Sequence, residues 1–101
     1  MAISDPSPLS QTHEMSLTLA DFERLLPKVE NIKNINKNNN LYRFNYLNEV
    51  LEITLERFTE RKIASLSLSV IFIRFEMKSS NQSVFNDFME QFFKTFQRGG
   101  G

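Results

Sequence analysis

The sequence has no cysteine and no tryptophan, one histidine (His13), and three glycines, all at its carboxyl end. The lack of cysteine excludes disulfides, thiol nucleophiles, thiolate zinc sites and iron–sulfur clusters. A Ser-His-Asp catalytic arrangement needs an imidazole held beside its nucleophile, and His13 falls in a segment expected to be unstructured. Glycine-rich phosphate loops are also missing, so no cofactor is expected and we predict a non-enzymatic protein.

Charge of one sign is lacking as well, because twelve basic and twelve acidic residues give a net charge of zero. This balance removes the charge excess expected of a dedicated nucleic-acid or anionic-membrane binder. No segment approaches the ~20 apolar residues of a membrane span, and the amino end has neither the basic nor the apolar region of a signal peptide. We therefore expect a soluble, cytoplasmic protein without a membrane partner.

A chain of 101 residues is long enough for one domain. Residues 1–16 contain Pro6, Pro8 and four serines with few apolar side chains, so we expect them to form a disordered tail. Residues 17–98 then make a single α+β domain, and residues 99–101 make a flexible glycine tail.

The first helix is predicted to begin near Thr18, whose hydroxyl precedes Asp21 by three residues as in a capping box. Pro27 should end or kink this helix, because proline removes a backbone donor and restricts the preceding residue. The apolar positions at helical spacing are Leu19, Phe22, Leu25, Leu26 and Val29.

Residues 31–40 contain six asparagines, a composition typical of a flexible connection. A phosphate-contacting loop that uses Lys28, Lys33 and Lys37 is the alternative. Whether this region, or residues 17–19, adds a fourth strand to the sheet stays open.

Residues 42–46 and 51–56 alternate apolar with polar side chains and predict two strands, each buried on one face. A three-residue loop would place apolar residues opposite polar ones, so it is rejected. A turn at Asn48-Glu49, or across residues 47–50, instead pairs Phe44 with Ile53. The same register pairs Tyr46 with Leu51 and Tyr42 with Leu55.

A polar turn over residues 59–62 is expected to lead to a third strand over residues 65–77. Leu66 would lie opposite Leu55 and continue the buried face with Leu68. From Val70 the strand is apolar on both sides, which predicts either a bulge or cover on both faces.

The last element is a Phe-rich amphipathic helix that begins near Ser80 or Asn81 and stops at Gly99. Its apolar positions are Val84, Phe85, Phe88, Met89, Phe92, Phe93 and Phe96. The predicted order is thus α-β-β-β-α, with an antiparallel sheet of three strands, or four, and this helix packed on the face that contains Phe44, Leu66 and Leu68.

The acidic and aromatic residues of the strands favour structural roles. Glu52 and Glu56 lie four positions apart, about 13 Å along a strand, so they cannot share a metal ion directly and are read as a solvated face. The aromatic residues at 42, 44 and 46 alternate into the core, which argues against an RNA-stacking platform.

The preferred function is a small protein-interaction domain, in which Ile71, Ile73 and Phe75 face water on the open side of the sheet and form the contact surface. Either the first helix or a second copy of the chain, in a homodimer, is expected to cover this apolar surface. A weak nucleic-acid binder that uses Lys33, Lys37, Arg57, Arg61 and Lys62 is a further alternative, although a nucleic-acid partner is not expected.

The closing residues carry two resemblances. The terminal glycines are similar to the tails of ubiquitin-like modifiers and sulfur carriers, which implies Gly100 and Gly101 as a tail site. Those families have a β-grasp fold and place the tail after a strand, whereas here it follows a predicted helix. The stretch Phe-Gln-Arg-Gly-Gly-Gly also resembles the end of short bacterial proteins without an assigned function, so it implies no activity.

Overall fold

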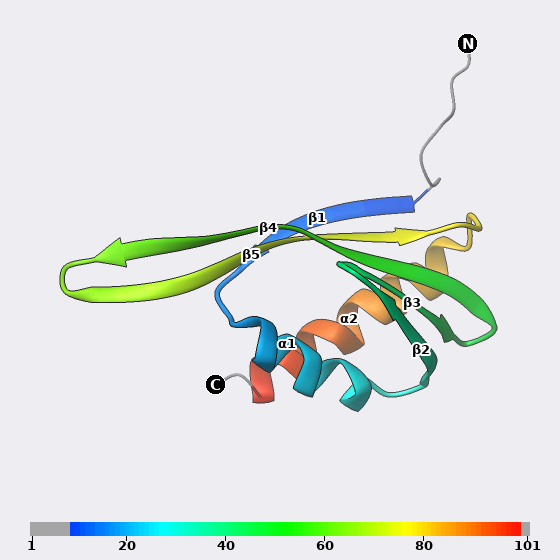
Figure 1. Ribbon diagram of the computed structural model, residues 1–101. Coiled ribbons are helices and arrows are strands. Elements are labelled where there is room, and N and C mark those ends of the chain that lie inside the picture. Colours follow the sequence, from blue (N-terminus) through cyan, green and yellow to red (C-terminus); the bar gives the residue numbers. More distant parts are fainter. Residues whose placement is uncertain (1–8, 100–101) are drawn as a thin grey trace, which may run out of the picture.

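A computed structural model of the chain describes residues 9–99. It is an α+β fold with one antiparallel sheet of five strands in the order β1-β5-β4-β3-β2, and both helices lie on the same face of this sheet (Figure 1). The elements are β1 (Leu9–Met15), α1 (Leu19–Leu25), the 3-10 turn η1 (Leu26–Lys28), β2 (Ile32–Asn38), β3 (Leu41–Tyr46), β4 (Glu49–Ile63), β5 (Leu66–Met77) and α2 (Gln82–Gly99). The α+β class is confirmed, but the predicted strand number and element order were incomplete.

Helix α2 lies across the sheet and supplies the centre of the core. Phe88 is fully buried, with its ring centroid 5.3 Å from that of Phe44 and 5.2 Å from that of Tyr46. One turn further on, Phe92 meets Phe75 edge-on at 4.8 Å. The apolar stripe of this helix therefore packs on the sheet as the sequence predicts.

Helix α1 closes one end of the core. The Thr18 hydroxyl accepts a hydrogen bond from the Asp21 backbone N–H at 3.1 Å, so the predicted cap is confirmed. Pro27 converts the last turn into η1, as expected of a residue without a donor. Phe22 is buried, with ring centroids 5.1 Å from Tyr42 and 5.7 Å from Phe96.

The prediction of an unstructured segment is wrong for Leu9–Met15, which forms strand β1. It pairs antiparallel with β5 from Leu9↔Met77 to Met15↔Ile71. Half-buried and exposed side chains alternate along it, with Leu9 and Met15 against the core. The segment becomes a strand because its backbone pairs with the edge of β5. Of the other residues of the expected tail, Ser16 follows β1 outside any helix or strand, and residues 1–8 lie outside the described part of the chain.

The Asn-rich segment is the edge strand β2 rather than a flexible connection, so the Ile32 region supplies a strand that the sequence left undecided. It pairs antiparallel with β3 and contains a bulge between Lys33 and Asn36. Asn34 within the bulge and Asn39 in the following turn have positive φ values of 58° and 57°. Asparagine tolerates this geometry, so the composition that suggested a loop instead permits a bulged strand.

The β3–β4 hairpin keeps the predicted inward face but not the predicted register. Phe44 pairs with Leu51 and Tyr42 with Ile53, a shift of two residues from the expected pairs. The turn is Leu47-Asn48, in which both residues have positive φ, 48° and 68°. Such primed turns match the twist of antiparallel strands, but leucine is a rare occupant, so the sequence pointed to Asn48-Glu49 instead.

The polar turn predicted over residues 59–62 is not present. Strand β4 continues to Ile63, and the chain reverses at Ala64-Ser65, where Ala64 has a φ of 56°. Leu66 therefore pairs with Ile63, and Leu55 pairs with Ile73. A bulge does occur, but it lies on β4 between Leu55 and Arg57 rather than on β5.

We expect Phe88→Ala to lower the free energy of unfolding by ~3–5 kcal/mol, because it removes a fully buried ring whose neighbours cannot close the space. That loss is a large share of the ~5–15 kcal/mol of a typical domain. Denaturant unfolding measures it, with Lys94→Ala on the exposed side of α2 as the control, within about 0.5 kcal/mol of the wild type. A loss below about 1 kcal/mol for Phe88→Ala would contradict the packing of α2.

Removal of residues 1–15 should strongly destabilise the domain, because it deletes β1 and bares the edge of β5 from Ile71 to Met77. The melting temperature measured by circular dichroism tests this expectation. An unchanged melting temperature would show that β1 contributes no stability.

Candidate functional site

The residues predicted to form an interaction surface are in the core. Ile71, Ile73 and Phe75 are at most 1% exposed and face the helices. The prediction is wrong because the long β4–β5 hairpin registers Ile73 and Phe75 with Leu55 and Ile53, which belong to the face that α2 covers. The open face of the sheet instead carries the alternate residues of β5, including Arg74 and Glu76.

The unusual feature of the surface is the end of the β4–β5 hairpin, residues 57–63 and 66–70, here called the arm. It projects from the body of the molecule (Figure 1). Strand β3 pairs with β4 only as far as Thr54, and β1 pairs with β5 only as far as Ile71. Within residues 9–99, both outer edges of the arm therefore have no neighbouring strand.

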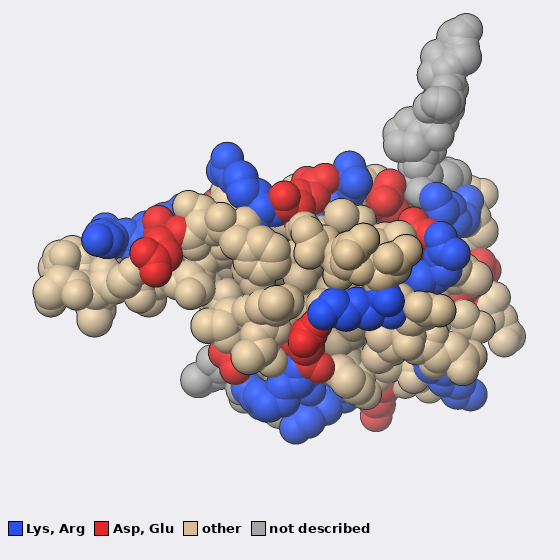
Figure 2. Space-filling view, in the orientation of Figure 1, with Lys and Arg blue, Asp and Glu red and all other residues tan. Residues whose placement is uncertain are grey.

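Apolar side chains are exposed along the arm. Phe58, Ile63, Leu66 and Leu68 have exposed fractions of 47%, 52%, 64% and 39%. The pairs Ile63↔Leu66 and Arg61↔Leu68 place three of them on the open face of the sheet, whereas Phe58 pairs with Ile71 and faces the helices. On the face that Figure 2 shows, no charged side chain is visible at the outermost end of the arm, and charged side chains are visible nearer the body of the molecule.

Charge on the arm belongs to one strand. Residues 57–63 of β4 include Arg57, Glu60, Arg61 and Lys62, whereas β5 has no charged residue before Arg74. The Arg57 guanidinium lies over the Phe72 ring, 4.5 Å from its centroid, and Arg61 forms an ion pair with Glu14 of β1. These contacts hold the base of the arm and leave its tip bare.

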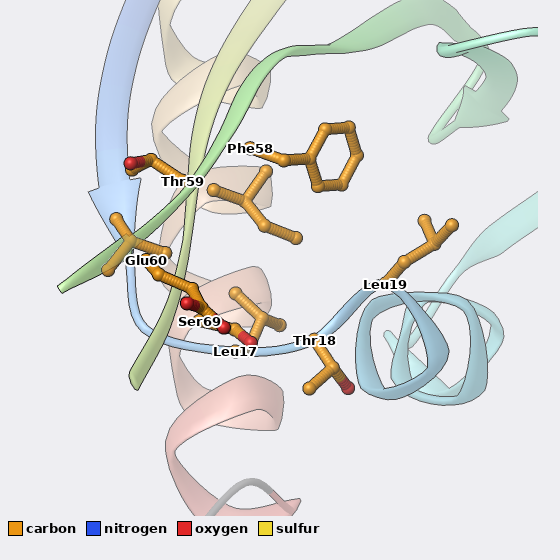
Figure 3. Close-up of a pocket in the computed structure, with 9 residues that line it drawn as sticks. Leu17, Thr18, Leu19, Phe58, Thr59, Glu60 and Ser69 are labelled. Atoms are coloured by element: carbon orange, nitrogen blue, oxygen red, sulfur yellow. The ribbon is translucent and has the colours of Figure 1, made fainter. Parts of the chain in front are cut away.

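A pocket of about 470 Å³ lies at the base of the arm, between β4, β5 and the segment that joins β1 to α1. Figure 3 shows the Phe58 ring and the Leu19 side chain on the same side of this space, with Glu60 and Ser69 opposite. The lining residues are Leu17, Thr18, Leu19, Phe58, Thr59, Glu60, Ser69, Val70 and Ile71. With one carboxylate and three hydroxyls among them, the pocket suits an apolar side chain better than it suits acid–base chemistry.

The acidic residues of the open sheet face are paired. The carboxylate of Glu52 contacts Arg43 at 2.6 Å and Lys78 at 3.6 Å, and Arg74 contacts Glu56 at 2.9 Å. Glu56 keeps about a third of its side chain exposed, whereas Glu52 is only 6% exposed, so the prediction of a solvated face is wrong at Glu52. Among the residues that the structure describes, no cluster of three His, Asp or Glu side chains is arranged to hold a metal ion.

The five cations considered for nucleic-acid binding do not form one patch. Lys33 and Lys37 lie on β2, whereas Arg57, Arg61 and Lys62 lie on the arm. Lys37 contacts Glu23 at 2.6 Å, and the ion pair of Arg61 with Glu14 neutralises a second cation. Lys28 of the alternative phosphate loop lies in η1, and the Asn-rich segment beside it is a strand.

His13 lies in β1 and packs between aromatic rings, edge-on to Phe75 at 5.7 Å and to Phe93 at 5.0 Å. Its Nε2 is 2.8 Å from the Gln11 side-chain oxygen. The imidazole of His13 therefore packs against the aromatic core beside α2.

Two buried tyrosines tie the sheet to the helices. The Tyr46 hydroxyl donates to Asp87 at 2.5 Å, and the Tyr42 hydroxyl donates to Glu23 at 2.7 Å. Burial raises the pKa of both phenols above the ordinary value, and the carboxylate partners add to the effect. Both groups therefore stay protonated at neutral pH and act as fixed donors.

Glu49 links the start of β4 to the start of α2. Its carboxylate accepts hydrogen bonds from Ser79 at 2.7 Å and from the Asn81 side chain at 3.0 Å, and these bonds lower its pKa below the ordinary 4.5. The pKa of Glu23 is lowered in the same way by Lys37 and Tyr42. Both carboxylates join elements of the fold.

The proposed tail site, Gly100 and Gly101, lies outside the described residues, and helix α2 extends to Gly99. Neither of the two helices within residues 9–99 has the length and apolar character needed to cross a membrane. In comparisons with known proteins, no family model, no curated protein and no solved structure matches this chain.

We expect the stability of the domain to fall as the pH drops through the lowered pKa of Glu49. The carboxylate is stabilised in the folded state, so its contribution is complete above pH 4.5 and is lost on protonation. Glu49→Gln should therefore lower the free energy of unfolding at pH 7 and have a smaller effect at pH 3.

Denaturant unfolding at both pH values measures this difference, and in a Ser79→Ala background its pH-dependent part should shrink. An effect of Glu49→Gln that is the same at both pH values would contradict the role of the carboxylate.

Proposed function

We propose that this chain is a small, non-enzymatic protein-interaction domain, with the arm and the pocket at its base as its contact surface. The observation that carries the proposal is the exposure of Phe58, Ile63, Leu66 and Leu68 on a hairpin that no other strand flanks within residues 9–99. Each of these side chains contributes little to the core.

The arm is expected to have low stability and low solubility if nothing packs against it. A two-stranded hairpin is marginally stable in water, and apolar side chains on it add a tendency to associate. Its base is nevertheless held by the Arg57–Phe72 contact and by the Arg61–Glu14 ion pair. A hairpin that is held at its base and apolar at its tip is suited to present its surface to another protein.

The pocket gives this surface a recognition element. Phe58 and Leu19 leave 47% and 40% of their areas exposed along its wall, so an apolar side chain from a partner would bury both. Burial of a Phe or Leu side chain is worth ~1.5–3 kcal/mol, enough to anchor a contact. The flanking Glu60 and Ser69 offer polar groups at the rim.

The proposal takes precedence over the two other functions considered. Nucleic-acid binding has less support because Lys37 and Arg61 are paired with carboxylates and the candidate cations are divided between β2 and the arm. A carboxyl-terminal tail carrier depends on Gly100 and Gly101, which the structure does not describe.

Phe58→Ser should lower the recovery of a bound protein at least ~10-fold in affinity capture with the tagged full chain, because ~1.4 kcal/mol of lost burial corresponds to a factor of ten. Quantitative mass spectrometry of captured proteins other than the chain itself provides the measurement. Leu47→Ser is the matched control, since Leu47 is 45% exposed but lies in the β3–β4 turn.

Recovery should be unchanged for Leu47→Ser. If Phe58→Ser captured the same proteins as the wild type in the same amounts, or if both variants lost them equally, the pocket would not be the contact surface.

A further inference from the structure

The two strand edges of the arm differ in charge, and this difference affects which of them another strand can pair with. Exposed strand edges recruit other strands, and proteins protect them with charged residues, prolines, bulges or short length. Residues 57–63 of β4 carry four charged side chains, so this edge is protected. Residues 66–70 of β5, Leu-Ser-Leu-Ser-Val, carry no charge and no proline.

The outer edges of the sheet are better protected than this segment of β5. Strand β2 has Lys33, Lys37 and a bulge with Asn34 at positive φ. Strand β1 turns polar side chains, Ser10, Thr12 and Glu14, to the open face. Residues 66–70 are therefore the one stretch of strand edge within residues 9–99 that combines apolar side chains with none of these protections.

The segment is also complementary to itself. In an antiparallel pair about a twofold axis at Leu68, Leu68 faces its own copy and Leu66 faces Val70 of the second chain. The same register places Ser67 opposite Ser69, so apolar residues meet on one face and hydroxyls on the other. A shift by one residue would pair each leucine with a serine, and the alternation therefore excludes it.

The neighbouring strand leaves room for this pairing. Strand β1 ends at Met15 opposite Ile71, next to the last residue of the free segment. The turn at Ala64-Ser65 ends the segment on the other side. The backbone edge of these five residues thus has no paired strand; residues 66–69 are exposed, and the Val70 side chain is already buried within the chain. A five-residue segment from a second copy can pair with this edge.

We propose that a second copy of this chain pairs antiparallel with residues 66–70 of β5, about a twofold axis at Leu68, to form a continuous sheet β4-β5-β5-β4 through the two arms. Such an interface is isologous, because the same edge serves in both copies. The inference rests on the proposed function only in that the arm is the contact surface. Phe58 lies on β4, away from this edge, and faces the helices, whereas Ser69 and Val70 belong both to the lining of the pocket and to the paired segment.

Sedimentation equilibrium of the full chain tests the dimer. The wild type should show twice the 11.8 kDa of one chain at micromolar concentration. Leu68→Lys sets two like charges opposite each other and should raise the dissociation constant at least ~10-fold. The matched control is Ile35→Lys on β2, since Ile35 is 36% exposed against 39% for Leu68.

Circular dichroism should show that both variants are folded, and Ile35→Lys should remain a dimer. A wild type that is monomeric at high micromolar concentration would overturn the proposal. So would a folded Leu68→Lys that dimerises like the wild type, or an Ile35→Lys that dissociates equally.

A single cysteine tests the register without a change of charge, because the chain has no cysteine of its own. Leu68→Cys should form a disulfide-linked dimer under mild oxidation, since the two positions face each other at the distance that a disulfide spans. Leu66→Cys is the control on the same edge and face, because its two copies would lie about 13 Å apart at ~3.3 Å per residue.

Equal cross-linking of both cysteine variants, or none for Leu68→Cys, would overturn the register. The two proposals fail separately. A monomeric wild type whose capture of other proteins still depends on Phe58 would remove only the dimer, whereas a dimer without any effect of Phe58→Ser would remove only the pocket.

Discussion

The packing of the α2 phenylalanine stripe on the sheet is the interaction on which the rest of this structure depends. Phe88 and Phe92 meet rings from β3 and β5, and Phe96 extends the contact to Phe22 of α1. Ring pairs of this kind add stability beyond the area they bury. These ring contacts join α2 to β3, β5 and α1.

This packing also determines which side chains occupy the centre of the fold. The inward face is filled by aromatic and aliphatic side chains, and His13 is used as one more ring among them. The buried hydroxyls of Tyr42 and Tyr46 are engaged by carboxylates of the helices. The exposed apolar side chains on which the proposed contact surface depends lie instead on the arm.

The sequence predicts correctly those helices and strands whose apolar residues recur at a clear helical or strand spacing. The spacing of Phe85, Phe88 and Phe92 predicts α2, and the alternation around Phe44 and Ile53 predicts the inward faces of β3 and β4. Strand β1 escapes prediction because its alternation is weak and its stability comes from the edge of β5. The two turns that set the strand registers have Leu47 and Ala64 at positive φ, and neither residue type is expected there. The hydrophobic pattern of the sequence therefore predicted both turns at the wrong positions.

The arm was missed for the same reason. Once the turn lies at Ala64-Ser65 instead of residues 59–62, the apolar face of Leu66 and Leu68 moves from the core to the surface, and Ile73 and Phe75 take its place. The two-sided apolar run in β5 then has a physical explanation, because one end of the strand serves the core and the other end serves the arm. A strand edge that is apolar, uncharged and self-complementary costs solubility when it is bare. That cost is removed when a matching edge covers it, and in the proposed dimer the same segment of another copy covers residues 66–70.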